Sequence, residues 1–144
     1  MRTRKESIKD LIINKFKLID LGIDFMGYRF KKKCQLSGHH VIPRREGGKD
    51  KEDNLVVLVQ DTSHNYLHHI ERFDRKRFKA ITEQLRKENK LGYIDLKILE
   101  EIDGILLEFE EQHREDTFKN GEILVRDIYR KRLIREKDKN LLYY

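Results

Sequence analysis

Five of the six histidines in this chain fall between residues 39 and 69, a stretch that also holds its single proline and its one Gly-Gly pair. Two of these histidines are adjacent, His39 and His40, and two lie four residues apart, His64 and His68. Imidazole is the commonest metal ligand among side chains and the usual group for proton transfer near neutral pH. The two groups can act together only if the chain between them folds back on itself.

The residues between the two groups have the pattern of a β-hairpin. Residues 39–42 form a short run that ends at Pro43, as strands do before a turn. Gly47-Gly48 and the charged residues 49–53 predict a loop. The five aliphatic residues 55–59, three of them valine, predict a second strand.

A helix is expected directly after the second strand. Asp61 or Thr62 can accept the N–H groups of its first turn, and the helical period then places His64 and His68 on one face. Neighbouring residues of a strand point to opposite sides, so the two adjacent histidines should not share a role. One of them is expected to join His64 and His68 around a metal ion, and the other to face a substrate. His69 points about 100° away from His68, toward solvent or a phosphate.

Four motifs follow one another in this stretch. They are Gly38-His39-His40-Val41-Ile42-Pro43-Arg44, Gly47-Gly48, Asn54-Leu55-Val56-Val57-Leu58 and His64-x3-His68. In this order they resemble the HNH nuclease family, whose core is the ββα-metal fold, although each alone would be weak evidence. The resemblance covers residues 34–72. It implies an α+β fold, mostly helical, with a short antiparallel hairpin in the metal core and further helices at both ends.

The resemblance also implies roles for single residues. His39 and His64 fall on metal-ligand positions. His68, one helical turn further, falls on an additional ligand position of the colicin-like branch. His40 falls on the general base, and Asn54 on the asparagine that braces the loop and orients the base.

Two departures from the family pattern bear on the ligands. The segment from Asn54 to His64 is one residue longer than in most members, so either His64 or a neighbour is the ligand. Many members also hold a structural zinc with Cys-x2-Cys pairs, whereas this chain has one cysteine, Cys34. Three imidazoles suit zinc, nickel or manganese. If only His39 and His64 bind, magnesium or manganese with several waters is expected.

The implied function is that of a metal-dependent endonuclease that hydrolyses phosphodiester bonds, most simply in double-stranded DNA. His40 would take a proton from water, and one divalent metal ion (zinc, manganese, nickel or magnesium) would polarise the phosphate. Free-standing relatives of this size are common in phages and mobile elements, which suggests that setting.

Basic residues close to the motifs are candidates for contacts with the nucleic-acid backbone. The net charge of +6 and the pI near 9.3 favour a polyanion as partner. The candidates are Arg44, Arg45, Lys31, Lys32, Lys33, Arg75 and Lys76. A simply solvated surface is the alternative for each of them.

The chain is expected to form a single domain, 1–144. Its parts are an N-terminal helix with a basic lead-in (1–33), the HNH core (34–75) and a C-terminal helical extension (76–144).

Within these parts, residues 5–20 predict an amphipathic helix that Ser7 caps and Gly22 ends. Residues 25–30 alternate as in a strand. The helix that carries the last histidines is expected to continue with one break near Asp74.

In the extension, Gly92 marks a turn and Asp95 caps a new helix. The apolar residues at helical spacing within 98–109 form either a core face or a face that pairs two chains in a homodimer. Residues 94–116 hold nine acids and two bases, a net charge of −7, while the remainder carries +13. This acidic helix should therefore face away from nucleic acid, and residues 122–137 predict a last, basic helix.

One cysteine excludes an internal disulfide framework, and no apolar run is long enough for a membrane span. We therefore expect a cytoplasmic protein with no membrane partner. Three other functions fit the same sequence. They are a catalytically silent nucleic-acid-binding protein on the same fold, a ribonuclease that uses the same site, and a regulatory protein that acts through the acidic helix.

Overall fold

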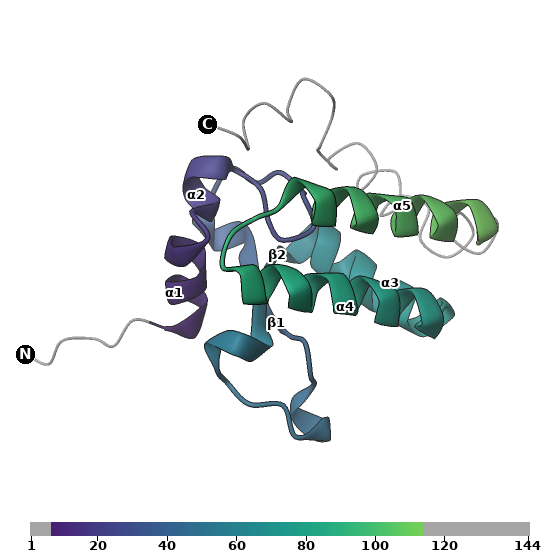
Figure 1. Ribbon diagram of the computed structural model, residues 1–144, viewed down its shortest axis with the longest axis horizontal. Helices are drawn as coiled ribbons and strands as arrows, with labels where there is room; N and C mark the ends of the chain where they lie inside the picture. Colours follow the sequence, from purple (N-terminus) through teal and green to yellow (C-terminus); the bar gives the residue numbers. More distant parts are fainter. Residues whose placement is uncertain (1–6, 114–144) are drawn as a thin grey trace, which may run out of the picture.

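The computed structural model describes residues 7–113. Predictions that fall on residues 1–6 and on the basic helix at 122–137 lie outside this range. The described elements follow the chain in the order α1 (Ile8–Lys15), α2 (Leu18–Leu21), β1 (Leu36–His40), β2 (Leu55–Val59), α3 (Asn65–Phe73), α4 (Arg75–Leu91) and α5 (Leu96–Gln112) (Figure 1). The fold is α+β and mostly helical with one antiparallel hairpin, which confirms the predicted fold class.

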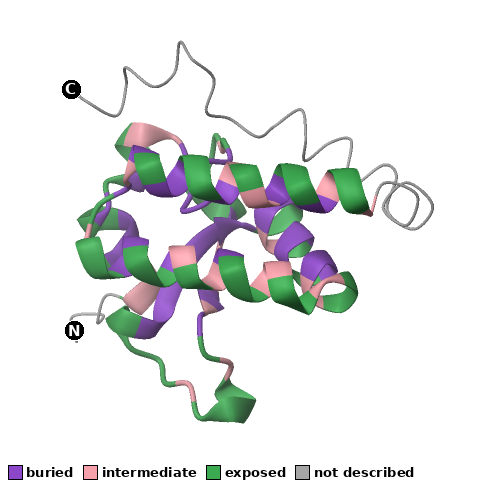
Figure 2. Ribbon diagram, turned by 45° about the vertical axis from the view of Figure 1, so that its right-hand side comes forward, coloured by how far each residue is buried: buried purple, intermediate pink, exposed green. Residues whose placement is uncertain are grey.

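Strands β1 and β2 form a two-stranded antiparallel sheet in which His39 lies opposite Val56 and His40 lies opposite Leu55. The first strand ends at His40 and does not include residues 41–42, which were predicted to belong to it, because the N–H of Ile42 binds the side chain of Asn54. All five residues of β2 are buried, and helices α1 and α4 contact this strand. Removing one such aliphatic side chain from water contributes about 1.5–3 kcal/mol, so β2 anchors the hairpin. Figure 2 shows the sheet among the helices, while the loop between the strands, residues 41–54, extends away from them with mostly exposed residues.

The first helical segment is interrupted, unlike the single helix predicted for the start of the chain. Ser7 caps α1 and Gly22 ends α2, as predicted. Between these two residues, Lys17 adopts a left-handed conformation with φ of 55°. In an unbroken helix Phe16 and Leu18 would point about 200° apart. The break allows both side chains to enter the core.

Residues 25–30 do not form the predicted strand. They make a tight turn that is flanked by one isolated bridge. The buried carboxylate of Asp24 accepts the backbone N–H groups of Met26 and Tyr28, at 2.8 and 2.9 Å. These donors bind a side chain instead of a neighbouring strand, which the alternating apolar pattern could not indicate.

The helical extension has the predicted breaks and caps. Asp74 separates α3 from α4 and caps α4, Gly92 ends α4, and Asp95 caps α5. Helices α4 and α5 then lie side by side (Figure 1). The apolar stripe of α5 is a core face, in which Ile102 and Phe109 are completely buried. None of the described helices is both long and apolar enough to cross a membrane.

The connection from β2 to α3 is a single π-helical turn, Gln60–His64. Within the described structure neither Asp61 nor Thr62 caps the helix through its side chain, so that prediction is wrong. A π-helical turn closes its hydrogen bond one residue later than an α-helical turn. The turn therefore accommodates the long spacing between Asn54 and His64 before the chain enters α3.

Candidate metal centre

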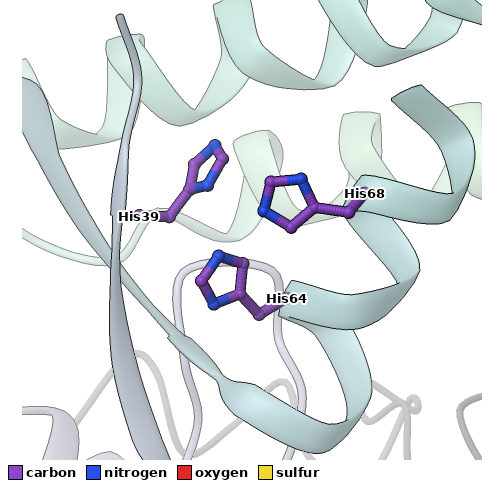
Figure 3. A group of neighbouring side chains, drawn as sticks. All are labelled: His39, His64 and His68. Carbon is purple, nitrogen blue, oxygen red and sulfur yellow. The ribbon is translucent and has the colours of Figure 1, made fainter. Parts of the chain in front are cut away.

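Three histidine side chains from separate parts of the site converge on one point. His39 comes from β1, His64 from the end of the π-helical turn and His68 from α3. Figure 3 shows their rings gathered around a common centre. One ligand nitrogen from each ring lies within 4.8 Å of the other two, and the ring centroids are 4.9 to 5.3 Å apart. Three imidazole nitrogens at this spacing can hold one metal ion.

The surroundings of His39 and His64 favour the neutral, metal-binding form of their imidazoles. Burial, together with the neighbouring histidines, lowers the pKa of His39 to about 3. Burial and the adjacent His68 lower the pKa of His64 to about 4. The Nε2 atom of His39 is buried and has no hydrogen-bond partner among the described residues. A neutral imidazole keeps the lone pair that a metal ion requires.

A hydrogen-bond chain fixes which nitrogen of His64 faces the centre. Its Nδ1 atom lies 2.6 Å from Ser37 Oγ, and Ser37 Oγ donates in turn to the carbonyl oxygen of Leu58 at 3.3 Å. Because the hydroxyl has a single hydrogen, it accepts from Nδ1–H of His64 and leaves Nε2 of that ring as the lone-pair donor. Ser37 precedes His39 by two residues, so strand alternation places both on one side of β1.

A carboxylate has the same role at His68. Glu71 accepts a hydrogen bond from Nδ1 of His68 at 3.1 Å, and a guanidinium nitrogen of Arg45 lies 3.7 Å from Glu71. Histidine ligands in metal sites typically donate their second nitrogen to a carboxylate or another acceptor. The donor set therefore fits one divalent ion held by three imidazoles, with water or substrate in the remaining positions.

His40 lies on the opposite side of β1, as strand alternation predicts. Its Nε2 atom is 2.5 Å from Oδ1 of Asp50, in the loop between the strands. Arg44 donates to both oxygens of the same carboxylate, at 2.9 and 2.8 Å. The hydrogen bonds from His40 and Arg44 lower the pKa of the Asp50 carboxyl. Because the side chain of His40 is 23% exposed, an external ligand can reach it.

Asn54 holds this loop in shape. Its Oδ1 accepts the N–H of Ile42 at 2.8 Å, and its Nδ2 donates to the carbonyl oxygens of Ile42 and Lys49, each at 3.0 Å. The side chain is buried, so these bonds are shielded from water. Asn54 therefore acts on His40 through the shape of the loop.

Two of the predicted nucleic-acid contacts lie beside the three histidines. Arg45 and Arg75 line a surface hollow together with His68, Glu71 and Arg72. Arg72 was not among the predicted contacts, although it lies one helical turn after His68 on α3. The hollow therefore places three guanidinium groups next to a candidate metal ligand.

The remaining lysines among the predicted contacts lie elsewhere. Lys33 pairs with Asp10 of α1 at 2.8 Å. Lys76 lines a different hollow, between α4 and α5, and Lys31 and Lys32 are exposed before β1. These lysines are not gathered with the arginines beside His68.

His69 is buried, whereas the sequence predicted that it points to solvent or contacts a phosphate. It is only 7% exposed, and its ring contacts those of Phe73 and Phe109 at centroid distances of 4.8 and 5.9 Å. Phe109, which covers the ring of His69, belongs to α5, and helix α4 separates α5 from α3 in the sequence. A local pattern therefore could not reveal the burial of His69.

A buried carboxylate in the segment before β1 supports the turn that carries His64. Asp24 accepts the backbone N–H of Val59 at 2.8 Å and the hydroxyl of Ser63. Burial raises the pKa of the Asp24 carboxyl, although its hydrogen bonds oppose that shift. Asp24 thus ties the turn of residues 25–30 to the start of the histidine-bearing helix.

Four residues that support the histidines were not predicted from the sequence. A signal existed for Ser37, which precedes a candidate ligand by two strand positions, and for Glu71, which follows one by three helix positions. No comparable signal existed for Asp24 and Asp50, because their contacts depend on the path of irregular segments.

Comparison with known proteins identifies the hairpin. Residues 27–61 match the family model described as HNH endonuclease. This match supports the family resemblance recognised from the motifs, and that resemblance suggests a nuclease-type activity. The match ends before His64 and His68, which the fold nevertheless brings to His39. Searches of curated proteins and of solved structures found no match.

Proposed function

We propose that this chain, an HNH-family protein by its hairpin, is a metal-dependent endonuclease that hydrolyses phosphodiester bonds in double-stranded DNA. One observation carries the proposal: adjacent residues of β1 face two different environments. His39 forms, with His64 and His68, a triad of imidazoles that fits a metal ion, and His40 faces an exposed loop. Both residues lie in the segment that matches the family.

A divalent ion held by His39, His64 and His68 would supply Lewis-acid stabilisation to the phosphate and to the leaving oxygen. Three imidazoles suit zinc, nickel or manganese better than magnesium, which prefers oxygen ligands. Ser37 and Glu71 support this assignment, because each orients a ring by accepting a hydrogen bond from its outer nitrogen.

His40 is the general base in this proposal. Its neutral imidazole takes a proton from a water molecule while the water oxygen forms a bond to phosphorus and the bond from phosphorus to the 3′-oxygen breaks. The 3′-oxygen gains a proton from solvent, so the products carry a 5′-phosphate and a 3′-hydroxyl. Asn54 contributes by holding the loop that faces the base.

The arginine-lined hollow beside His68 supports a polyanionic substrate. Arg45, Arg72 and Arg75 face it, and guanidinium groups bind phosphate oxygens well through charge and paired hydrogen bonds. Contacts of this kind position a nucleic-acid backbone without selecting a base sequence.

Cleavage of supercoiled plasmid tests the proposed function. Wild type and His40→Ala are incubated with magnesium, manganese, zinc, nickel or EDTA. We expect nicked or linear DNA from wild type with a metal ion, and a rate roughly 10²- to 10⁴-fold lower for His40→Ala. His113→Ala is the matched control. It removes the imidazole at the end of α5, which forms a hydrogen bond with Asp74, and this variant should cleave like wild type.

Two outcomes would replace the proposal. Intact plasmid under all conditions, with DNA still retained in a gel shift, would indicate a catalytically silent nucleic-acid-binding protein. Intact plasmid together with degraded RNA would indicate a ribonuclease.

A further inference from the structure

The loop between the strands brings one carboxylate to the ring of His40. Oδ1 of Asp50 lies 2.5 Å from Nε2 of His40, and Arg44 donates to both oxygens of that carboxylate. An ionised carboxylate only accepts hydrogen bonds, so the hydrogen in the short contact belongs to Nε2 of His40. A neutral imidazole with its hydrogen on Nε2 has its lone pair on Nδ1.

The position of Asp50 is built into the loop backbone. The carbonyl of Lys49, the residue before it, accepts a hydrogen bond from Asn54 Nδ2 at 3.0 Å. The N–H of Gly48 donates to the carbonyl of Pro43 at 2.9 Å, and a Cβ at Gly48 would lie 1.7 Å from a backbone carbonyl oxygen. The backbone that leads into Asp50 is therefore held in place, and its approach to the ring is a property of the loop.

The guanidinium group of Arg44 binds Asp50, within the same loop. Arg44 was predicted as a phosphate contact, but its guanidinium group is bonded to Asp50 at 2.8 and 2.9 Å. Arg44 thus binds both oxygens of the carboxylate, and one of them, Oδ1, also meets Nε2 of His40. Arg45, the neighbouring residue, points to Glu71 instead, so the two arginines have different surroundings.

We propose that Asp50 is the positioning residue of the general base: it orients the ring of His40, keeps the ring hydrogen on Nε2 and leaves Nδ1 as the atom that takes the proton from water. This inference rests on the proposed function, because it assigns the reacting atom of the proposed base. Asp50 touches neither water nor phosphate in this step, and Arg44 supports it by holding the carboxylate.

Single-turnover cleavage at increasing protein concentration tests the role in catalysis. Asp50→Asn should lower the maximal rate about 10- to 100-fold and leave the half-saturating concentration unchanged, because the residue orients the base and does not bind DNA. Asp50→Glu should restore part of the rate, since its carboxylate can reach the same nitrogen. Asp53→Asn removes the same charge from an exposed residue of the loop and should cleave like wild type.

The tautomer of His40 gives a second measurement that does not depend on cleavage. Two-bond ¹H–¹⁵N correlation spectra of protein with ¹⁵N-labelled histidine distinguish hydrogen on Nε2 from hydrogen on Nδ1. The His40 signals are identified by their loss in His40→Gln. We expect the Nε2–H form in wild type and in Asp53→Asn, and a mixture of both forms in Asp50→Asn.

The outcomes separate this inference from the function on which it rests. An unchanged cleavage rate in Asp50→Asn, with either tautomer, overturns the positioning role while a defective His40→Ala still supports the nuclease. Equal losses of the cleavage rate in Asp50→Asn and Asp53→Asn also overturn the positioning role, because the loss would then follow from the lower negative charge of the loop and not from the contact with His40. If wild type cleaves no nucleic acid, the proposed function fails, and the spectra alone decide whether Asp50 sets the tautomer.

Discussion

Different interactions stabilise the surroundings of His39 and of His40: apolar burial on one side of the hairpin and hydrogen bonds on the other. Around His39 apolar burial dominates: Val56, which lies opposite His39 on β2, is completely buried, and His39 itself is only 7% exposed. On the loop side, the residues from 41 to 54 are mostly exposed, and the hydrogen bonds of Asn54, Arg44 and Asp50 hold the chain. The same short strand therefore presents one histidine to a packed interior and the next to solvent.

This difference explains why one hairpin can serve two chemical tasks. A packed framework holds three imidazoles in a fixed arrangement, which suits a metal ion with strict distance requirements. An exposed polar loop leaves room for a polymeric substrate and can still fix a single ring by hydrogen bonds. The following predictions test whether the two sides act separately.

The largest effect is expected on the side of His39, from His64→Ala. Loss of one of three ligand nitrogens should abolish tight metal binding in calorimetry and lower plasmid cleavage on the order of 10³-fold. His40→Ala should bind the metal ion like wild type, because that ring lies on the other side of β1. Equal loss of metal affinity in both variants would mean that the two sides are not separate.

The next effect is expected on the loop side, from Gly48→Ala. The new Cβ would lie 1.7 Å from the carbonyl oxygen of Ile42, so the loop must move, at a cost of roughly 1–3 kcal/mol in the free energy of unfolding. Urea denaturation measures this cost, and cleavage should fall while metal binding persists.

Gly47→Ala is the control for that variant. Its φ of 91° makes alanine strained, at about 1–2 kcal/mol, but the new Cβ would meet no described atom within 4 Å. We expect a comparable loss of stability with cleavage retained. Loss of metal binding in Gly48→Ala would show that the loop also supports the triad.

A smaller effect is expected from Glu71→Gln. The carboxylate accepts the hydrogen bond from the outer nitrogen of His68, and replacing such a partner typically weakens metal binding 10- to 100-fold. Because a glutamine oxygen can still accept the bond, about 10-fold is expected in a chelator competition. Glu83→Gln changes an exposed acid of α4 and should leave the affinity unchanged; an equal loss there would indicate a general charge effect.

The smallest effect is expected from Glu88→Gln, behind the hairpin. Glu88 is buried on α4, and burial raises the pKa of its carboxyl well above the usual 4.5. The folded protein therefore keeps a proton on Glu88 that the unfolded chain loses above pH 4.5. The stability that this group contributes is fully present below pH 4.5, and it is lost as the pH rises through the folded-state pKa of Glu88.

Thermal unfolding at several pH values measures that dependence. Glutamine has no proton to lose, so Glu88→Gln should flatten the decline of stability with rising pH while cleavage stays as in wild type. The neighbouring residue Asn89 still links α4 to the hairpin through the carbonyl oxygens of Glu52 and Leu55. An unchanged pH slope in the variant would assign the dependence to other groups.

Local patterns predicted much of this molecule because they describe neighbours along the chain. The valine-rich run of residues 55–59 indicated β2, Ser7 and Asp95 indicated helix starts, and the helical period indicated a break near Asp74. The failures have a common cause in contacts from remote segments. The N–H groups of residues 26 and 28 bind the side chain of Asp24, so a pattern typical of a strand formed a turn.

The sequence by itself determined the hairpin, the opposite directions of His39 and His40, and the common face of His64 and His68, because strand and helix periods follow from backbone geometry. Only the tertiary structure decided that His39 meets the other two rings and that Asp50 meets His40. Those contacts join residues that no local period connects. They depend on the packing of β2 against α1 and α4, and on the hydrogen bonds that bend the loop back to the strand.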